Sequence, residues 1–275
     1  MLAIENHTVF SYGQELYFLN QKQDNVKVCD NMEECVSASD LIISGIPISK
    51  DNITISSPYS EKIIRLDFLK EKLNGKTLIA GVIPEWFTNE ENVDNKTSRE
   101  EKFRTIDLMN IEPFNILNAI PTVEGAIKIA IEETESTIHE SNVLILGHGR
   151  IGKILCDRFQ KMGANVYCAA RKDLDFAWIR EKRCVCVEYK ELPELANNID
   201  IIINTVPHIV INEKILKKLK QNCIIIELAS KPGGVDKKAN EMYKIRVITA
   251  LGIPGKIAPR TAAKYIKDTI EKISK

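Results

Sequence analysis

The second half of the chain alternates short, almost continuously apolar runs with amphipathic segments. The first apolar run covers residues 142–146, and a segment with helical spacing, residues 151–162, follows after a glycine-rich turn. Further strand-like runs cover residues 165–170, 184–187, 199–204, 223–228 and 246–249, with helical segments between most of them. Continuously apolar runs are typical of parallel strands that are covered on both faces, and their alternation with helices indicates βαβ units. The pattern therefore predicts an α/β fold with a doubly wound, parallel Rossmann sheet over residues 141–256.

The first half is less regular but is also of α/β type. Its strand-like runs cover residues 8–12, 26–29, 41–44 and 78–82. Helical spacing of Ile63, Leu66, Leu69 and Leu73 predicts a helix over residues 60–73. Residues 88–101 are polar and highly charged, which predicts an exposed, mobile surface element. Residues 1–120 are thus expected to form a second, smaller N-terminal α/β domain that contributes to substrate binding.

Two more helices are expected around the Rossmann domain. One begins at Pro121, with Thr122 as its N-cap and Glu124 in its first turn, and links the domains over residues 121–140. The other covers residues 260–273, and its apolar stripe predicts that the C-terminal segment, residues 257–275, packs back onto the first domain and closes the cleft between the domains.

Composition narrows the functional classes. Lys plus Arg and Asp plus Glu number 38 each, which gives no reason to expect nucleic acid or a membrane surface as a partner. No apolar run approaches ~18 residues, and residues 1–7 lack the layout of a secretory signal. The seven cysteines are scattered, and Cys184 and Cys186 have no second pair at ligand spacing. We expect a cytoplasmic protein with reduced thiols and no metal site.

A glycine motif carries the clearest chemistry. Gly147, Gly149 and Gly152 form the pattern GxGxxG between an apolar strand and a helix. The first glycine permits the tight turn, the second lets a diphosphate approach the backbone, and the third lets helix and strand pack closely. The motif predicts a dinucleotide site, in which His148 is expected to be a variable filler rather than a catalyst.

The end of the second strand of this domain bears on which dinucleotide binds. An NAD site usually has an acidic residue there for the ribose 2′-hydroxyl, whereas this chain has Arg171 and Lys172. Two cations suit a 2′-phosphate, so NADP is favoured. Asp173 follows directly and keeps NAD possible.

Four strand ends are unusually polar or rich in glycine and proline: residues 44–47, 204–208, 229–234 and 251–255. Ligands of doubly wound sheets bind outside the carboxyl ends of the strands. These loops are therefore expected to surround a nicotinamide and its substrate.

The motifs at residues 121–125, 147–152, 204–207, 228–234 and 252–259 resemble, in this order, the family of the dipicolinate synthase A chain. The resemblance is close over residues 115–270 and looser before them. It implies a dehydrogenase of endospore-forming bacteria, acting in the cytoplasm of the mother cell. Its substrate would be dihydrodipicolinate or hydroxy-tetrahydrodipicolinate, oxidised with NAD(P) to pyridine-2,6-dicarboxylate, and its partner would be the smaller B chain of dipicolinate synthase. The family's opening strand, Gly-Gly-Asp turn and helix have no match here, so we expect a first domain that is shortened at its start.

Candidate residues follow from this chemistry. Aromatising a dihydropyridine requires hydride transfer, loss of a proton, and two bound carboxylates. We expect His208 and Lys231 to act in catalysis, His208 as the proton relay and Lys231 by also holding a carboxylate. Ser44, Thr122, Glu124 and Arg260 are expected to bind substrate, with the helix N-terminus at Thr122 holding one carboxylate. The expected cofactor contacts are Gly147, Gly149, Arg150, Ile151, Gly152, Arg171, Lys172, Asn204, Thr205, Val206, Pro207, Ala229 and Ser230.

Two other functions remain open. The chain is compatible with another NAD(P) enzyme, similar to shikimate or methylene-tetrahydrofolate dehydrogenases, although the Lys and Asp motifs of those families are not seen in its first domain. It is also compatible with a nucleotide-binding partner chain that is catalytically incomplete. In each case we expect a homo-oligomer.

Overall fold

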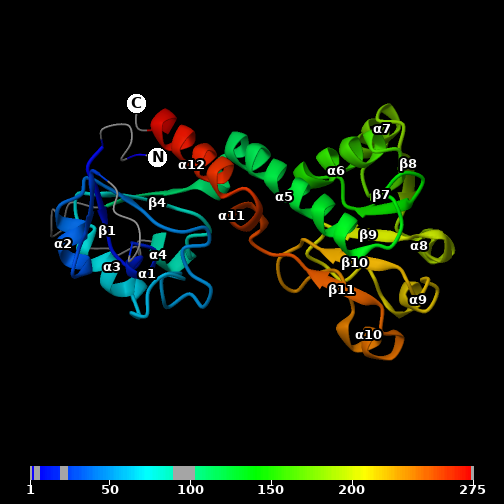
Figure 1. Ribbon diagram of the computed structural model, residues 1–275, viewed down its shortest axis with the longest axis horizontal. Coiled ribbons are helices and arrows are strands. Elements are labelled where there is room, and N and C mark those ends of the chain that lie inside the picture. Colours follow the sequence, from blue (N-terminus) through cyan, green and yellow to red (C-terminus); the bar gives the residue numbers. More distant parts are fainter. Residues whose placement is uncertain (1, 3–6, 19–23, 89–102, 274–275) are drawn as a thin grey trace, which may run out of the picture. The chain divides into compact units, whose positions relative to one another are not determined.

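The computed structural model describes residues 2, 7–18, 24–88 and 103–273 of the chain (Figure 1). These residues form two compact units. The first unit contains residues 1–115 and 263–275, and the second contains residues 116–262.

The second unit contains a six-stranded sheet in which every neighbouring pair is parallel. Its strands lie in the order β11-β10-β9-β6-β7-β8. Their bounds are β6 Asn142–Leu146, β7 Asn165–Ala170, β8 Val185–Glu188, β9 Ile201–Asn204, β10 Ile224–Glu227 and β11 Arg246–Thr249. The first strand of the unit, β6, thus lies between β7 and β9, and the order reverses there. This is the topology of a doubly wound Rossmann sheet, as the alternation of apolar runs predicts.

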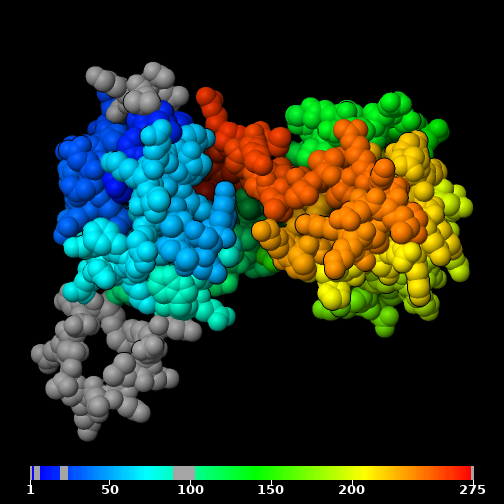
Figure 2. Space-filling view, turned by 90° about the horizontal axis from the view of Figure 1, so that it is seen from below, coloured from blue at the N-terminus to red at the C-terminus, as the bar shows by residue number. Residues whose placement is uncertain are grey.

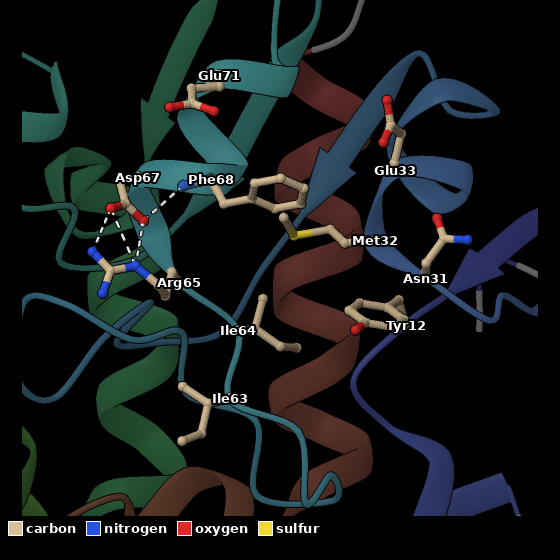
Figure 3. A pocket seen from close by; sticks show the side chains of 10 residues that line it. All are labelled: Tyr12, Asn31, Met32, Glu33, Ile63, Ile64, Arg65, Asp67, Phe68 and Glu71. Atoms are coloured by element: carbon tan, nitrogen blue, oxygen red, sulfur yellow. Dashed lines mark hydrogen bonds and ion pairs between the residues drawn. The ribbon is translucent and has the colours of Figure 1, made fainter.

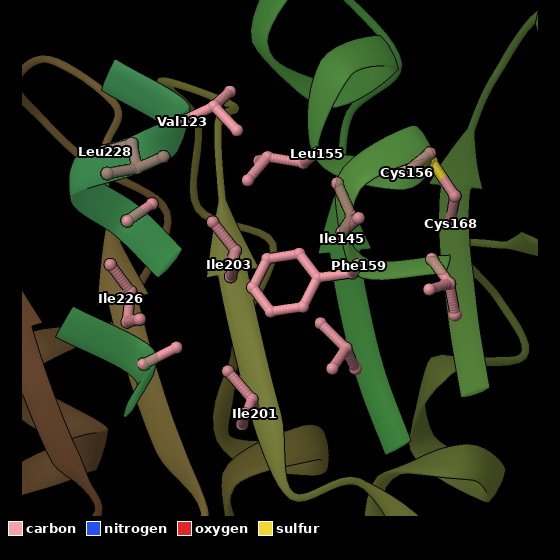
Figure 4. Close-up of a cluster of buried hydrophobic side chains, with 14 of the residues drawn as sticks. Val123, Ile145, Leu155, Cys156, Phe159, Cys168, Ile201, Ile203, Ile226 and Leu228 are labelled. Atoms are coloured by element: carbon pink, nitrogen blue, oxygen red, sulfur yellow. The ribbon is translucent and has the colours of Figure 1, made fainter. Parts of the chain in front are cut away.

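Both faces of this sheet are covered, because successive strand residues point to opposite sides. On one face, Ile145 and Ile203 pack against Leu155 and Phe159 of helix α6 (Arg150–Lys161) and against Val123 of helix α5 (Glu112–Glu133) (Figure 4). On the other face lie Leu144, Ile202 and Ile225, together with Leu192 and Ile215. The remaining helices of this unit are α7 Asp173–Glu181, α8 Leu192–Leu195, η3 Ala196–Asn198, α9 Glu213–Leu216, α10 Lys237–Tyr243 and α11 Ile253–Ile257. No residue of α10 is buried, and its surface is prominent, in orange, on the face shown in Figure 2.

Helix α5 spans Glu112–Glu133, so it begins well before the predicted start at Pro121. Pro121 lies inside the helix, and Thr122 is not an N-cap: its Oγ1 donates a hydrogen bond to the Asn118 carbonyl oxygen at 3.1 Å. Proline is a common start signal, but apolar positions upstream, including Phe114 and Ala119, are buried and extend the helix backwards. The prediction of a helix N-terminus at Thr122, with Glu124 in the first turn, is therefore wrong.

Helix α5 is also long and apolar enough, by length and composition, to cross a membrane. Its residues Val123, Ala126 and Ala130 lie in the core of the second unit. Packing of a core helix accounts for this apolar composition.

The first unit contains a two-stranded sheet, β1-β2, and a three-stranded sheet, β3-β4-β5, both parallel. The strands are β1 Val9–Ser11, β2 Val26–Val28, β3 Leu41–Ile43, β4 Thr77–Ala80 and β5 Arg104–Asp107, and the helices are α1 Glu15–Phe18, α2 Met32–Ser37, α3 Leu66–Lys72, α4 Glu85–Thr88 and η2 Leu108–Asn110. A core containing Met32, Leu69 and Leu78 joins α2, α3 and β4. Apart from Thr88, which ends α4, the predicted surface element at residues 88–101 lies outside the described residues.

The helix predicted over residues 60–73 is shorter in the structure. Helix α3 begins at Leu66, and the preceding residues pair with a neighbouring segment: Ile55 donates its N–H to the Ile64 carbonyl at 2.8 Å, and Thr54 bridges Arg65. Ile63 is 82% exposed, so its apparent place on an apolar helical stripe is a coincidence of spacing.

The final helix, α12 (Pro259–Ile273), reaches the core of the first unit. Ile270 packs there with Ile79 of β4, Leu108 and Phe114. The predicted closure of a cleft by this helix remains a prediction.

Candidate functional site

The glycine turn after β6 has the shape that a dinucleotide site requires. Gly147 has φ of +94°, a conformation that L residues rarely adopt, and a Cβ there would lie 2.6 Å from Thr205 Oγ1. A Cβ on Gly152 would lie 2.0 Å from the Gly147 carbonyl oxygen. A Cβ on Gly149 would meet nothing within 4 Å. The fold itself therefore requires the first and third glycines, whereas the second faces open space.

Helix α6 starts at this open position. Gly149 is its N-cap, and no side chain caps the helix. The first N–H groups of a helix have no partner within it and attract anions, aided by the helix dipole. The chain's own residues at Gly149, Arg150 and Ile151 thus fit the diphosphate of a dinucleotide.

The loop after β7 is cationic at its tip. Arg171 and Lys172 are exposed, and Asp173 is the first residue of α7. Asp175, two residues further along α7, is used inside the protein: His148 Nδ1 lies 3.3 Å from its Oδ1. The arrangement leaves two exposed cations where a 2′-phosphate would be held.

His148 is a structural residue of the glycine turn. Its side chain is 2% exposed, and its bond to Asp175 ties the turn to α7. Burial lowers the pKa of His148 below 6.5, an effect that Asp175 opposes. The expectation of a variable filler missed this contact.

We expect His148 to make the protein less stable in acid. Below its ordinary pKa, near 6.5, the unfolded chain binds a proton at His148 more readily than the folded chain does. Stability present at neutral pH is therefore lost as the pH falls through 6.5 toward the lower folded-state pKa. The His148→Asn protein should lose this part of the pH dependence, measured as the thermal midpoint between about pH 7.5 and about pH 5.5. His139→Asn, at an exposed histidine, is the control and should behave like the wild type.

The ends of β9 and β10 are held together by two buried side chains, Asn204 and Glu227. Asn204 Nδ2 donates to Glu227 Oε1 at 2.7 Å, and Asn204 Oδ1 accepts the Val206 N–H at 3.1 Å. Nearby, Thr205 Oγ1 donates to the Leu146 carbonyl at 2.7 Å, which links the β9 loop to the glycine turn. Glu227 is absent from the residues predicted from sequence. An acidic residue that ends the apolar run Ile224-Ile-Ile-Glu227 is the signal that could have revealed it.

The other predicted site residues occupy several settings. Pro207, His208, Ser230 and Lys231 are exposed on the loops after β9 and β10, and Ala229 is buried beside them. Arg260 is exposed in the first turn of α12, while Glu124 is exposed in the middle of α5. Thr122 cannot supply a helix N-terminus for a carboxylate, because its N–H lies within α5. Ser44 belongs to the first unit, where its N–H donates to the Ile79 carbonyl at 2.9 Å, and its role remains a prediction.

A cavity of about 440 Å³ lies in the first unit, and none of these candidates lines it. Tyr12, Met32, Ile64 and Phe68 line it. Arg65 and Asp67 also line it and form an ion pair with each other (Figure 3). No sequence signal points to this cavity, because its lining comes from separate segments of the chain.

The sequence matches two family models. Residues 123–239 match the NAD-binding domain of D-isomer-specific 2-hydroxyacid dehydrogenases, and residues 1–109 match the N-terminal domain of the dipicolinate synthase A chain. Among curated proteins, the chain is 33% identical over 236 residues to the dipicolinate synthase A chain of Bacillus subtilis (strain 168), covering 85% of this chain and 77% of that protein.

Solved structures agree with these matches. The crystal structure of the dipicolinate synthase A chain from Bacillus subtilis aligns with a TM-score of 0.82 at 30% identity, covering 99% of this chain and 89% of that chain. The corresponding structure from Bacillus halodurans aligns with a TM-score of 0.83 at 26% identity, covering 99% and 91%. A transhydrogenase from Sinorhizobium meliloti, at 15% identity and a TM-score of 0.64 over 90% of this chain and 77% of that one, shares the fold alone.

Proposed function

Because the chain belongs to the dipicolinate synthase A-chain family, we propose that it oxidises dihydrodipicolinate, or its hydroxy-tetrahydrodipicolinate precursor, to dipicolinate during sporulation. The coarser activity is established by the same matches: the chain is an NAD(P)-dependent oxidoreductase with a Rossmann domain. The observation that carries the proposal is the turn from Gly147 to Gly152, which leaves room for a diphosphate at Gly149 beside the polar loop that follows β9.

Bound NAD(P)⁺ supplies the hydride acceptor, and the chain's own residues supply the rest. A ring carbon of dihydrodipicolinate gives up a hydride, and the ring loses one proton. The hydroxy-tetrahydrodipicolinate precursor must first lose water to reach this stage. His208 is proposed to take this proton, because an imidazole nitrogen can act as a general base and the side chain is exposed on the loop after β9. Lys231 and Arg260 are proposed to hold the two carboxylates of the substrate as charge-assisted partners.

The cofactor is proposed to be NADP. Arg171 and Lys172 are exposed and available to a 2′-phosphate, and Asp175 is occupied by His148. Asp173 begins α7 beside these cations, so weaker use of NAD is expected as well.

The double variant Arg171→Ala/Lys172→Ala tests this assignment. A hydrogen bond to a charged group contributes about 1.5–3 kcal/mol, and solvent screening lowers this value at the exposed Arg171 and Lys172, so loss of both cations should weaken binding of NADP⁺ about 10- to 100-fold. NAD⁺ lacks the 2′-phosphate and should bind with nearly unchanged affinity. Titration calorimetry measures both constants, with Arg180→Ala on α7 as a control for the loss of a surface cation. Equal weakening of both dinucleotides would contradict a 2′-phosphate site at this loop.

The reaction itself is tested by supplying the aldol product of pyruvate and aspartate semialdehyde in situ. The proposal expects NADPH absorbance to grow together with the ultraviolet band of a pyridine dicarboxylate. The chain is assayed alone and with the B chain of dipicolinate synthase, which we propose as its partner. Formation of product only with the B chain would make this chain dependent on its partner for activity. If NADP⁺ binds but neither assay shows NADPH or the pyridine dicarboxylate band, the proposed reaction is contradicted.

A further inference from the structure

Glu227 is a buried carboxylate at the carboxyl end of β10 (Ile224–Glu227). The residue is 6% exposed, and its partner Asn204, the last residue of β9, is fully buried. A carboxylate in such a position is costly unless donors satisfy it. The groups that donate hydrogen bonds to Glu227 therefore indicate which parts of the structure this carboxylate fixes.

Three amide groups donate to the Glu227 carboxylate. Asn204 Nδ2 donates to Oε1 at 2.7 Å, the Ala229 N–H donates to Oε1 at 3.0 Å, and the Gly234 N–H donates to Oε2 at 2.8 Å. Each of these groups is a donor, and both carboxylate oxygens accept. The set suits the ionised form, which accepts hydrogen bonds only. The negative charge is thus solvated by neutral amides.

These bonds close the loop that follows β10. Glu227 binds the loop at its start, Ala229, and at its end, Gly234, while the Gly233 N–H donates to the Ser230 carbonyl at 2.9 Å within it. The close fit is visible at Gly234, where a Cβ would lie 2.2 Å from Asn204 Nδ2. Ser230 is exposed on this fixed loop. Lys231, which is proposed to hold a substrate carboxylate, is exposed there as well.

Asn204 extends the same hold to the β9 loop. Its Oδ1 accepts the Val206 N–H at 3.1 Å, and its Nδ2 donates to the Val206 carbonyl at 2.9 Å. The pair Asn204 and Glu227 therefore fixes both loops that follow these two strands.

In doubly wound folds with this strand order, the dinucleotide lies across the carboxyl ends of the strands, and its nicotinamide half belongs to the strands beyond the reversal of order. Here those strands are β9 and β10. The oxidised nicotinamide ring carries a positive charge and the reduced ring does not. A buried anion at these strand ends therefore interacts differently with the two forms, and low solvent screening strengthens the difference.

We propose that Glu227 is a positioning residue that fixes the Ala229–Gly234 loop together with Asn204, and that its buried negative charge makes the site favour the oxidised dinucleotide over the reduced one. This rests on the proposed function for the presence of NADP at these loops. The preference suits an enzyme that must bind NADP⁺ and release NADPH in each turnover.

The test measures dissociation constants for NADP⁺ and NADPH separately, by calorimetry, in the wild type and in three variants. Glu227→Gln removes the charge, and Glu227→Asp retains it on a shorter side chain. Asp200→Asn removes a charge near the amino ends of the strands of the same sheet, where Asp200 accepts the Asn142 N–H at 2.8 Å. Thermal unfolding reports the cost in stability separately.

The wild type should bind NADP⁺ more tightly than NADPH. In Glu227→Gln the ratio of the two constants should shift toward NADPH by about 5- to 50-fold, while Glu227→Asp and Asp200→Asn keep the wild-type ratio within about twofold. Equal weakening of both forms in Glu227→Gln would reduce Glu227 to a structural residue and overturn the proposal. If Glu227→Gln does not fold, the wild type alone still tests the proposal, because a wild type that binds NADPH more tightly than NADP⁺ overturns it. Each of these two results overturns the role of Glu227 but, as long as NADP⁺ still binds, does not contradict the proposed reaction. A wild type that binds no nicotinamide dinucleotide contradicts both the role of Glu227 and the proposed reaction.

Discussion

Replacement of Gly149 by valine should abolish dinucleotide binding and leave the fold intact. A Cβ at this position meets nothing within 4 Å, and its backbone, with φ of −79° and ψ of −161°, is accessible to any residue. The added side chain would instead occupy the space through which a diphosphate reaches the N–H groups of α6. We expect the affinity for NADP⁺ to fall by about 100-fold or more, with a thermal midpoint close to that of the wild type.

Gly152→Ala is the matched variant with the opposite effect on the fold. Its Cβ would lie 2.0 Å from the Gly147 carbonyl oxygen, which is backbone and cannot move aside without displacing the turn. We expect a loss of about 1–3 kcal/mol in the free energy of unfolding, as for other overpacked sites, together with weaker binding. Urea unfolding and calorimetry on both variants separate the two effects. A Gly149→Val protein that unfolds as easily as Gly152→Ala would show that the open space at Gly149 is needed for folding rather than for binding.

The Rossmann sheet could be predicted because its signal is local. Runs such as Ile201-Ile-Ile-Asn204 are apolar on both faces, and the turn glycines lie between a strand and a helix, so pattern and chemistry agree. The family resemblance drawn from the same motifs is confirmed by the matches. Fold and family therefore followed from residues close together in the sequence.

The parts that could not be predicted depend on tertiary contacts. Pro121 and Thr122 form a good local start signal, but burial of Phe114 and Ala119 extends α5 through them. Spacing alone favours a helix around Ile63, whereas the segment before α3 pairs with residues around Thr54.

The same limit applies to the site. In the sequence Glu227 is only a polar residue at a strand end, and the bonds from Asn204, Ala229 and Gly234 are what show that it holds two loops. His148 likewise has the pattern of a filler, although Asp175 lies beside it in the fold. The roles of such side chains depend on partners that are distant in the sequence, so the residues around them in the sequence do not reveal these roles.

The two strand-end groups proposed for catalysis should separate by kinetics. His208→Gln keeps a polar side chain but removes the group that takes the proton, so kcat should fall about 10²- to 10⁴-fold with little change in KM. Lys231→Met keeps much of the side-chain length but removes the charge proposed to hold a substrate carboxylate. KM should then rise about 10- to 100-fold while kcat changes less.

His139→Gln provides the control, since His139 is exposed and precedes β6, at the amino ends of the strands and away from these loops. Steady-state rates of NADP⁺ reduction, followed at several pH values, measure both parameters. If Lys231→Met instead lowers kcat and His208→Gln does not, the proton passes through Lys231. The carboxylate must then be held by another cation, and Arg260 is the remaining candidate among the residues proposed in the second unit.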